Sequence, residues 1–358
     1  ISKVDNPPKE DKLFEGANYP VEQELNPEDV VEIFKTPLTG CYNWDYKVQD
    51  NRIKKLYELG KELEWNVEKD VDWSIPYPEF SDDGFKFMDD QWKNHKDYAK
   101  LSYEDRCQFI KDSQDWTISQ LMHGEQGALL VASQLTSCAP TFNAKLYAAS
   151  QTFDEARHVE AFNKYLQTRL QRSWPIGRAL KGLLDKILTD PRWDLKFIGM
   201  QVVIEGLALA AFQASREASS DPVYKQMVEY IIRDEARHVT FGINYLKDFV
   251  TTLSEEEQID RAQFALEACT VSRNRLRAYD VWEKYGMDLA FTEEYQKENI
   301  FQTQFQDVLF SRIMPNLKKI GLLREELVPE YDKLGVMGYA DGDSDYETSW
   351  EELSKPLK

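Results

Sequence analysis

Two nearly identical segments carry the residues that are most able to do chemistry. The sequence DEARHVEAFNKYL at 154–166 returns 80 residues later as DEARHVTFGINYL at 234–246. On a helix, residues three positions apart lie on the same face, so the Glu and the His of each segment can reach one metal site together. Carboxylate and imidazole groups are common ligands of iron and manganese. The repeat therefore predicts two helices that each offer a Glu-x-x-His pair to a metal site: Glu155 with His158, and Glu235 with His238.

A single acid in an apolar stretch precedes each copy of the repeat, again with the same offset. Glu125 lies in LMHGEQGALLVASQL, and Glu205 lies in QVVIEGLALAAFQAS. A charged side chain is rarely buried without a partner, and clustered carboxylates repel one another unless a cation holds them. Carboxylates from four helices and imidazoles from two of them suit two iron or manganese ions in a ferritin-like four-helix bundle. A solvated helix face with an ion pair would explain one DEARH segment, but not two copies at a common offset.

Helical periodicity must position these residues, and it dominates from Ser102 to about 280. Prolines at 140, 175, 191 and 222 punctuate the pattern. An earlier helix is expected at 46–66, a loop at 67–98, and short helices within 293–325. No useful length alternates with period two, so we expect an all-α protein.

The chain divides into three regions, which we expect to pack as one domain overall. Residues 1–100 would form an N-terminal arm and an accessory helix. Residues 101–253 would form the dimetal four-helix bundle, and residues 254–358 would add accessory helices and an irregular acidic tail.

Composition excludes several classes of function. The chain has 44 basic and 63 acidic side chains, a net charge of −19, which argues against binding to nucleic acid or to an anionic membrane surface. The most apolar stretch, near 197–212, contains Glu205, so no membrane span is expected. The first residues do not resemble a signal peptide. Four scattered cysteines indicate reduced thiols, and a cytoplasmic location is therefore expected.

Over about 101–250 the sequence resembles the diiron-carboxylate superfamily, on the doubled Asp-Glu-x-Arg-His motif and the two single glutamates. That group includes the small subunit of ribonucleotide reductase and the hydroxylase subunits of bacterial multicomponent monooxygenases. The resemblance implies that the four glutamates are catalytic and that some of them bridge two metals. It implies two sets of ligands: Glu125, Glu155 and His158 for one ion, and Glu205, Glu235 and His238 for the other.

The aspartate before each glutamate also has an expected role. A metal-bound histidine usually donates its other ring N–H to a carboxylate, and in the resembled families the aspartate of one motif serves the histidine of the other. We therefore expect Asp154 to pair with His238 and Asp234 to pair with His158. Two arginines would balance the aspartate charges, or would be ordinary surface ion-pair partners: Arg157 and Arg237.

Two positions depart from the resembled families. Phe162 stands where the reductase subunit commonly has a radical-forming tyrosine, and Leu209 stands where the hydroxylases commonly have a threonine. Apolar residues near the ligands could line a substrate pocket, although each could equally be core: Ala128, Leu129, Phe162, Ala208, Leu209 and Phe212.

The sequence therefore predicts an O2-activating oxidoreductase with two iron ions per chain, or with Mn/Fe or Mn/Mn, acting as a monooxygenase on a small apolar or aromatic substrate. A radical-generating small subunit and an iron store or peroxide scavenger are the alternatives. No G-x-G-x-x-G, flavin or iron–sulfur motif is present, so a separate reductase or ferredoxin is expected, with a homodimeric or hetero-oligomeric assembly. A basic stretch could dock that donor or be an ordinary solvated linker: Arg169, Arg172, Arg178 and Lys181.

Overall fold

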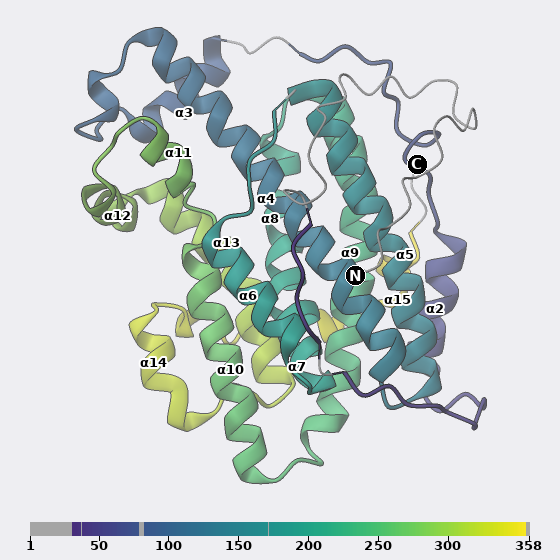
Figure 1. The fold of residues 1–358 in the computed structure, drawn as a ribbon. Helices are drawn as coiled ribbons and strands as arrows, with labels where there is room; N and C mark the ends of the chain where they lie inside the picture. Colours follow the sequence, from purple (N-terminus) through teal and green to yellow (C-terminus); the bar gives the residue numbers. More distant parts are fainter. Residues whose placement is uncertain (1–30, 37, 79–81, 171, 356–358) are drawn as a thin grey trace.

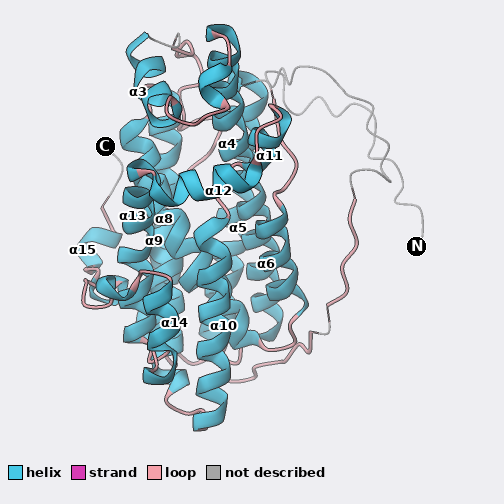
Figure 2. Ribbon diagram, turned by 90° about the vertical axis from the view of Figure 1, so that its left-hand side faces the viewer, coloured by secondary structure: helices cyan, strands magenta, loops and turns pink. Residues whose placement is uncertain are grey.

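The computed structural model describes residues 31–36, 38–78, 82–170 and 172–355. Within these ranges every regular element is a helix, and the long helices run side by side (Figures 1 and 2). The expectation of an all-α fold is thereby confirmed.

Four long helical segments form the bundle. Helix α4 packs against α5, and α8 packs against α9. A side-chain oxygen caps the start of three of the segments: Ser102, Thr141 and Asp221. The segments are α4 (Tyr103–Cys138), α5 (Phe142–Tyr165), the continuous run of α7 (Trp193–Phe197), η4 (Ile198–Ile204) and α8 (Glu205–Ala218), and α9 (Pro222–Val250).

The third segment contains a stretch of π-helix. In η4 the backbone N–H of Glu205 bonds to the carbonyl of Met200, five residues earlier. Such a stretch contains more residues per turn and often occurs at functional sites. It changes the direction in which the residues after it point, and Glu205 is the first of them.

Further helices cover the bundle. Helix α2 packs on α5 and α9, α6 on α4, α10 on η4, and α13 on α8. Helices α3, α11 and α12 gather at one end of the molecule (upper left in Figure 1). Their bounds are α2 (Asn51–Glu62), α3 (Asp82–Trp92), α6 (Arg178–Thr189), α10 (Glu255–Asn274), α11 (Tyr279–Lys284), α12 (Leu289–Glu298) and α13 (Ile300–Lys319). The short elements are η2 (Tyr98–Lys100), η3 (Leu166–Leu170), η5 (Glu325–Leu327), α14 (Val328–Lys333), η6 (Met337–Tyr339), η7 (Asp345–Glu347) and α15 (Trp350–Leu353).

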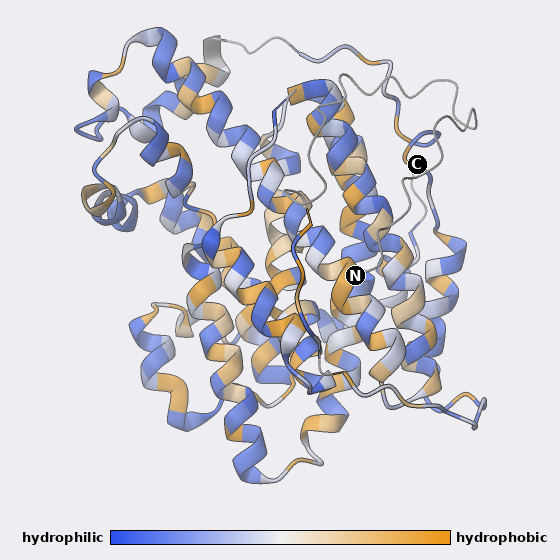
Figure 3. Ribbon diagram, viewed as in Figure 1, coloured by the Kyte–Doolittle hydropathy of each residue, from blue (hydrophilic) through white to orange (hydrophobic). Residues whose placement is uncertain are grey.

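One hydrophobic cluster joins the bundle to its flanking helices. It includes Ile53 of α2, Leu183 of α6, Ala265 of α10 and Phe310 of α13. Figure 3 shows hydrophobic residues, coloured orange, along the helices of the bundle. The segment Trp193–Ala218 is long and apolar enough to cross a membrane, but it is buried as the core helix of this bundle. Residues from each of the three regions expected from the sequence belong to this cluster, and the division into these regions stays a prediction.

Some sequence expectations for the flanking regions were wrong. The stretch 67–98 is not all loop, because it contains α3. The accessory helix begins at 51 rather than 46, where the Asp50 carboxylate caps it. The tail after 328 includes short helices. Residues 31–36 and 38–45 form no helix or strand, and the first 30 residues of the expected arm lie outside the described residues.

Candidate metal centre

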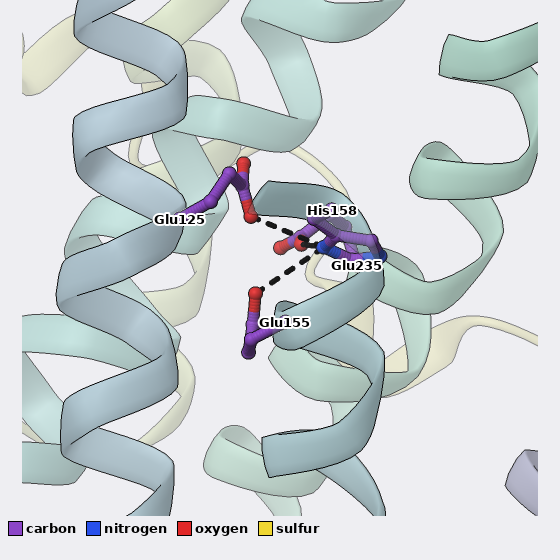
Figure 4. Close-up of side chains that lie close together, drawn as sticks. All are labelled: Glu125, Glu155, His158 and Glu235. Carbon is purple, nitrogen blue, oxygen red and sulfur yellow. Dashed lines mark hydrogen bonds and ion pairs between the residues drawn. The ribbon is translucent and has the colours of Figure 1, made fainter. Parts of the chain in front are cut away.

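Six polar side chains converge inside the bundle, and none of these residues is more than 4% exposed. Each of the four helical segments contributes at least one. Figure 4 shows four of the six, with three carboxylates around one imidazole ring. The six are Glu125 on α4, Glu155 and His158 on α5, Glu205 at the start of α8, and Glu235 and His238 on α9.

The first group of possible ligands surrounds His158. Its Nδ1 atom lies 3.1 Å from Oε2 of Glu125 and 3.2 Å from Oε2 of Glu155. It also lies 3.2 Å from Oε1 of Glu235. These four residues each offer one ligand atom within 4.8 Å of the others. Such a spacing is close enough to surround one ion.

The second group comprises Glu155, Glu205 and His238. His238 Nδ1 lies 3.1 Å from Oε1 of Glu155 and 3.6 Å from Oε1 of Glu235. Glu155 belongs to both groups, because its Oε2 faces His158 and its Oε1 faces His238, so this carboxylate could hold either ion. Glu235 lies closer to His158 than to His238, and the six residues therefore divide differently from the two triads that the resemblance implied.

The outer nitrogens of both imidazoles face an aspartate of the opposite repeat. His158 Nε2 lies 3.1 Å from Oδ2 of Asp234, and His238 Nε2 lies 3.1 Å from Oδ2 of Asp154. This is the cross-pairing named in the sequence analysis. A hydrogen bond at Nε2 orients the ring and leaves Nδ1 facing the carboxylates.

Two arginines and one tryptophan hold these aspartates. The Arg157 guanidinium bonds to Asp154 and reaches Asp234 at 3.3 Å, and the Arg237 guanidinium bonds to Asp234. Both arginines are buried, so they are not surface ion-pair partners. The indole N–H of Trp65 donates to Oδ2 of Asp234 at 2.7 Å. Sequence reasoning missed Trp65, because an aromatic residue after a helix gives no sign of what it contacts.

Gln151 is a second residue that sequence reasoning missed. Its amide Nε2 donates to Oε1 of Glu205 at 2.8 Å and to Oε1 of Glu155 at 3.1 Å. It lies four residues before Glu155 and hence on the same face of α5, which is the one signal that the sequence offered. The amide fixes two carboxylates that come from different helices.

Several buried atoms of the cluster make no hydrogen bond of acceptable angle among the described residues, although some lie within 3.2 Å of an oppositely charged neighbour. They are both carboxylate oxygens of Glu235, Oε2 of Glu205 and Nδ1 of His238. Buried polar atoms are nearly always hydrogen-bonded. Here the atoms without hydrogen bonds are carboxylate oxygens and an imidazole nitrogen of one cluster, which are the atom types that bind iron and manganese. The residues therefore fit a pair of these ions.

Electrostatics favour the same interpretation. Burial, and then repulsion from a neighbouring glutamate, raises the pKa of Glu125 and of Glu205 well above the usual value. Burial acts to lower the pKa of His158 and His238, but the surrounding carboxylates outweigh it and raise both values well above the usual range. A cation that enters must displace protons from the imidazoles, and it relieves the repulsion among the carboxylates.

A cavity reaches the cluster. Glu125, Glu205 and Glu235 line it together with Arg275. Its wall includes Leu121, Leu180, Ile204 and Leu276, and also two of the expected pocket residues, Ala128 and Ala208.

The other four expected pocket residues do not line this cavity. The rings of Phe162 and Phe212 stack 5.7 Å apart within a buried hydrophobic cluster. Leu209 belongs to the main core, and Leu129 is half-buried. All four lie on ligand-bearing helices, but Phe162, Leu209 and Phe212 pack in the hydrophobic clusters rather than at the cavity.

The basic stretch is partly neutralised by the chain itself. Arg172 pairs with Asp112, Lys181 pairs with Asp185, and Arg169 donates to the carbonyl of Trp73. Surface charges paired in this way have less field to offer a partner. Docking of an electron donor at this stretch stays a prediction.

Replacing either outer aspartate with asparagine is expected to weaken metal binding. Asp154→Asn and Asp234→Asn keep the side-chain shape but remove the charge that orients a histidine, and such changes typically cost about 10–100-fold in metal affinity or activity. Competition with a chelator measures the affinity. Asp185→Asn, which changes an exposed ion pair on α6, serves as the control. Unchanged metal affinity in both Asp154→Asn and Asp234→Asn would show that these aspartates do not orient the histidines.

The chain is similar to a known protein family and to several solved structures. A protein family described as P-aminobenzoate N-oxygenase AurF matches residues 47–310, about three quarters of the chain. No curated protein sequence matches. Two similar solved structures are mutants of an R2-like ligand-binding oxidase with an Mn/Fe cofactor, reconstituted anaerobically in one and aerobically in the other. They are 20% and 19% identical, each with a TM-score of 0.50, 77% of this chain covered and 96% of that chain covered. At this identity the likeness shows the fold alone.

Proposed function

Because the chain belongs to the P-aminobenzoate N-oxygenase AurF family, we propose that it uses O2 to oxidise a small organic substrate at the six-residue cluster. Family and fold make it a non-haem dimetal oxygenase. The single observation that carries the proposal is the buried group of carboxylates and imidazoles, in which several possible metal-ligand atoms have no hydrogen bond. Iron in both positions is the first choice, and Mn/Fe or Mn/Mn suits the same donors.

The six ligands of the proposed centre are Glu125, Glu155, His158, Glu205, Glu235 and His238. When bound, the metal pair supplies Lewis acidity, a place for O2 and electrons for its reduction. Asp154 and Asp234 keep the Nε2 protons of the imidazoles in place, and the Gln151 amide donates to two carboxylates and so fixes their positions. Buried apolar side chains around the cavity exclude water, which would otherwise react in place of the substrate.

The substrate is expected to be apolar or aromatic over most of its surface, since the cavity wall is largely apolar. Oxidation at nitrogen, as the family description names it, is the first reaction to test. The experiment loads the protein with Fe(II) without oxygen, adds O2 with p-aminobenzoate or aniline, and follows product mass. Products that carry oxygen from labelled O2 support the proposal. A loaded protein that forms no oxygenated product from any aromatic amine or hydrocarbon tested contradicts it.

Repeated turnover is expected to need electrons from outside the chain. Insertion of one oxygen atom consumes O2, two electrons and two protons and releases one water, so a reduced metal pair supports about one product before it must be reduced again. We propose a separate reductase or ferredoxin as the physiological donor, since the sequence has no flavin, nicotinamide or iron–sulfur motif. The measurement is product per chain with and without a chemical reductant. Many turnovers with NADH and this chain alone would contradict the prediction.

Location and assembly also stay predictions. Four free cysteines support a reducing, cytoplasmic location. A homodimer or hetero-oligomer is expected, and sedimentation of the purified protein tests it.

A further inference from the structure

A second cavity lies among the flanking helices, where residues from the end of α10, from α12 and α13 and from 334–339 meet. It has a volume of about 120 Å³, and it shares no lining residue with the cavity at the proposed metal centre. One water molecule needs roughly 10–15 Å³ of such space, so this cavity has room for a group the size of a phosphate. Two of its lining residues, Lys297 and Thr303, are exposed, and a ligand can therefore enter from solvent.

Two arginines line this cavity without an acidic partner. Arg277 is only 6% exposed, and its Nη1 atom donates to the hydroxyl of Tyr279 at 3.2 Å. Within the described residues neither Arg273 nor Arg277 belongs to an ion pair, whereas both buried arginines of the metal cluster pair with an aspartate. Burial, and then repulsion from Arg277, lowers the pKa of Arg273. An anion that contacts both guanidinium groups would relieve this repulsion.

The other charged residues at the cavity do not neutralise the two arginines. Lys297 is a third cation, and it pairs with Glu293 and Glu294. Asp307 is the one acid among the described residues that line the cavity. Its carboxylate accepts a hydrogen bond from the Tyr339 hydroxyl and forms no ion pair with either arginine. The lining side chains thus carry three positive charges and one negative charge.

Two glutamines supply hydrogen-bond acceptors at the same cavity. Gln296 is 2% exposed and its Nε2 donates to the backbone carbonyl of Arg277, while Gln306 Nε2 donates to the carbonyl of Arg273. The amide nitrogens are thereby used, but the Oε1 atom of each glutamine is buried and has no donor in the described part of the chain. Buried acceptors are nearly always hydrogen-bonded. A ligand that satisfies this cavity therefore carries O–H groups as well as negative oxygens.

We propose that the second cavity binds an oxyanion that carries O–H groups, as in hydrogenphosphate or a hydroxylated phosphate monoester. Arg273 and Arg277 donate to the negative oxygens, because the fork of a guanidinium matches the geometry of phosphate. Gln296 and Gln306 accept hydrogen bonds from the O–H groups. The site does not depend on the proposed oxygenation, since none of its residues belongs to the metal cluster.

Calorimetric titration of the metal-loaded protein tests this site, at constant ionic strength and in a buffer without phosphate. The probes are inorganic phosphate, glycerol 3-phosphate and sulfate. Phosphate keeps at least one O–H group at neutral pH and sulfate keeps none, so sulfate can accept from the arginines but cannot donate to the glutamines. The variants are Arg273→Gln, Asp307→Asn and a control, Arg216→Gln, which removes a positive charge from an ion pair on α8 outside the cavity.

We expect the wild type to bind one of the two phosphates at least about tenfold more tightly than sulfate, because sulfate leaves both buried acceptors unsatisfied. Arg273→Gln should lose at least about tenfold in affinity for that phosphate. Asp307→Asn should bind it more tightly, since the one negative charge at the cavity is gone, and Arg216→Gln should match the wild type. The phosphate that binds more tightly tells whether the ligand is the free ion or a monoester.

Three results would overturn the proposal. The first is equal phosphate affinity in the wild type and Arg273→Gln, since phosphate would then bind elsewhere, as at the metals. The second is sulfate that binds as tightly as both phosphates, or no binding of either phosphate at millimolar concentration. The third is an affinity in Asp307→Asn that does not rise. Failure of the proposed function would appear separately, as a wild-type protein that binds no metal or forms no oxygenated product.

Discussion

Replacing His158 and His238 together with alanine is expected to reduce the metal content from about two ions per chain to almost none. Carboxylates from different helices meet at the Nδ1 atom of each imidazole. His158 Nδ1 lies 3.1 Å from Glu125 and 3.2 Å from Glu155, and His238 Nδ1 lies 3.1 Å from Glu155. The double change removes both nitrogen donors. It also removes the hydrogen bonds to the outer aspartates, which orient the site. Metal analysis after anaerobic loading and desalting measures the loss.

A matched control separates this effect from general damage. His123 is a half-buried histidine on α4, whose Nε2 lies 2.8 Å from the carbonyl of Trp174 and outside the cluster. His123→Ala should therefore keep the full metal content. Circular dichroism shows whether the double variant remains helical. A folded double variant that still holds two ions would show that these six residues are not the metal centre.

The sequence predicted the cluster because the same residue types recur at one common spacing along the chain. The common offset between Glu125 and Glu205, and between the two DEARH segments, places equivalent residues on four helices. Helical periodicity then determines which side chains share a face. A histidine that binds a metal needs a partner at its other nitrogen, but only the resemblance to the diiron-carboxylate superfamily implied that Asp154 of one repeat serves His238 of the other.

What the sequence could not predict depends on contacts between distant segments. Trp65 reaches Asp234 across 169 positions of sequence, and Arg275 comes to the cavity from a helix outside the bundle. The π-helix before Glu205 has no signal in a pattern read at 3.6 residues per turn. Each of these features is set by packing, which a single sequence does not record.

The close approach of α9 to η4 is another such feature, and it leads to the second large prediction. A Cβ atom at Gly242 would lie 2.5 Å from Cβ of Gln201. Gly242 is one turn after His238, and Gln201 is one turn before Glu205, so this contact sets how closely two ligand-bearing segments approach. The equivalent position in the first repeat is Phe162, which instead packs on Phe212. Glycine is thus required at one copy of the repeat and not at the other.

Gly242→Leu is therefore expected to lower the free energy of unfolding by about 3 kcal/mol or more, because overpacking alone costs about 1–3 kcal/mol and a leucine exceeds the space by several atoms. Helix propensity acts in the opposite direction by only about 1 kcal/mol, so packing decides the sign. Gly242→Ala should give a smaller loss, as the two effects then nearly balance. Gly182→Leu on α6 is the control, since a Cβ there meets nothing within 4 Å. Urea unfolding measures stability, and metal content should fall in Gly242→Leu as η4 moves Glu205 away from His238. If Gly242→Leu unfolds at the wild-type urea concentration and binds metal normally, this contact does not position the site.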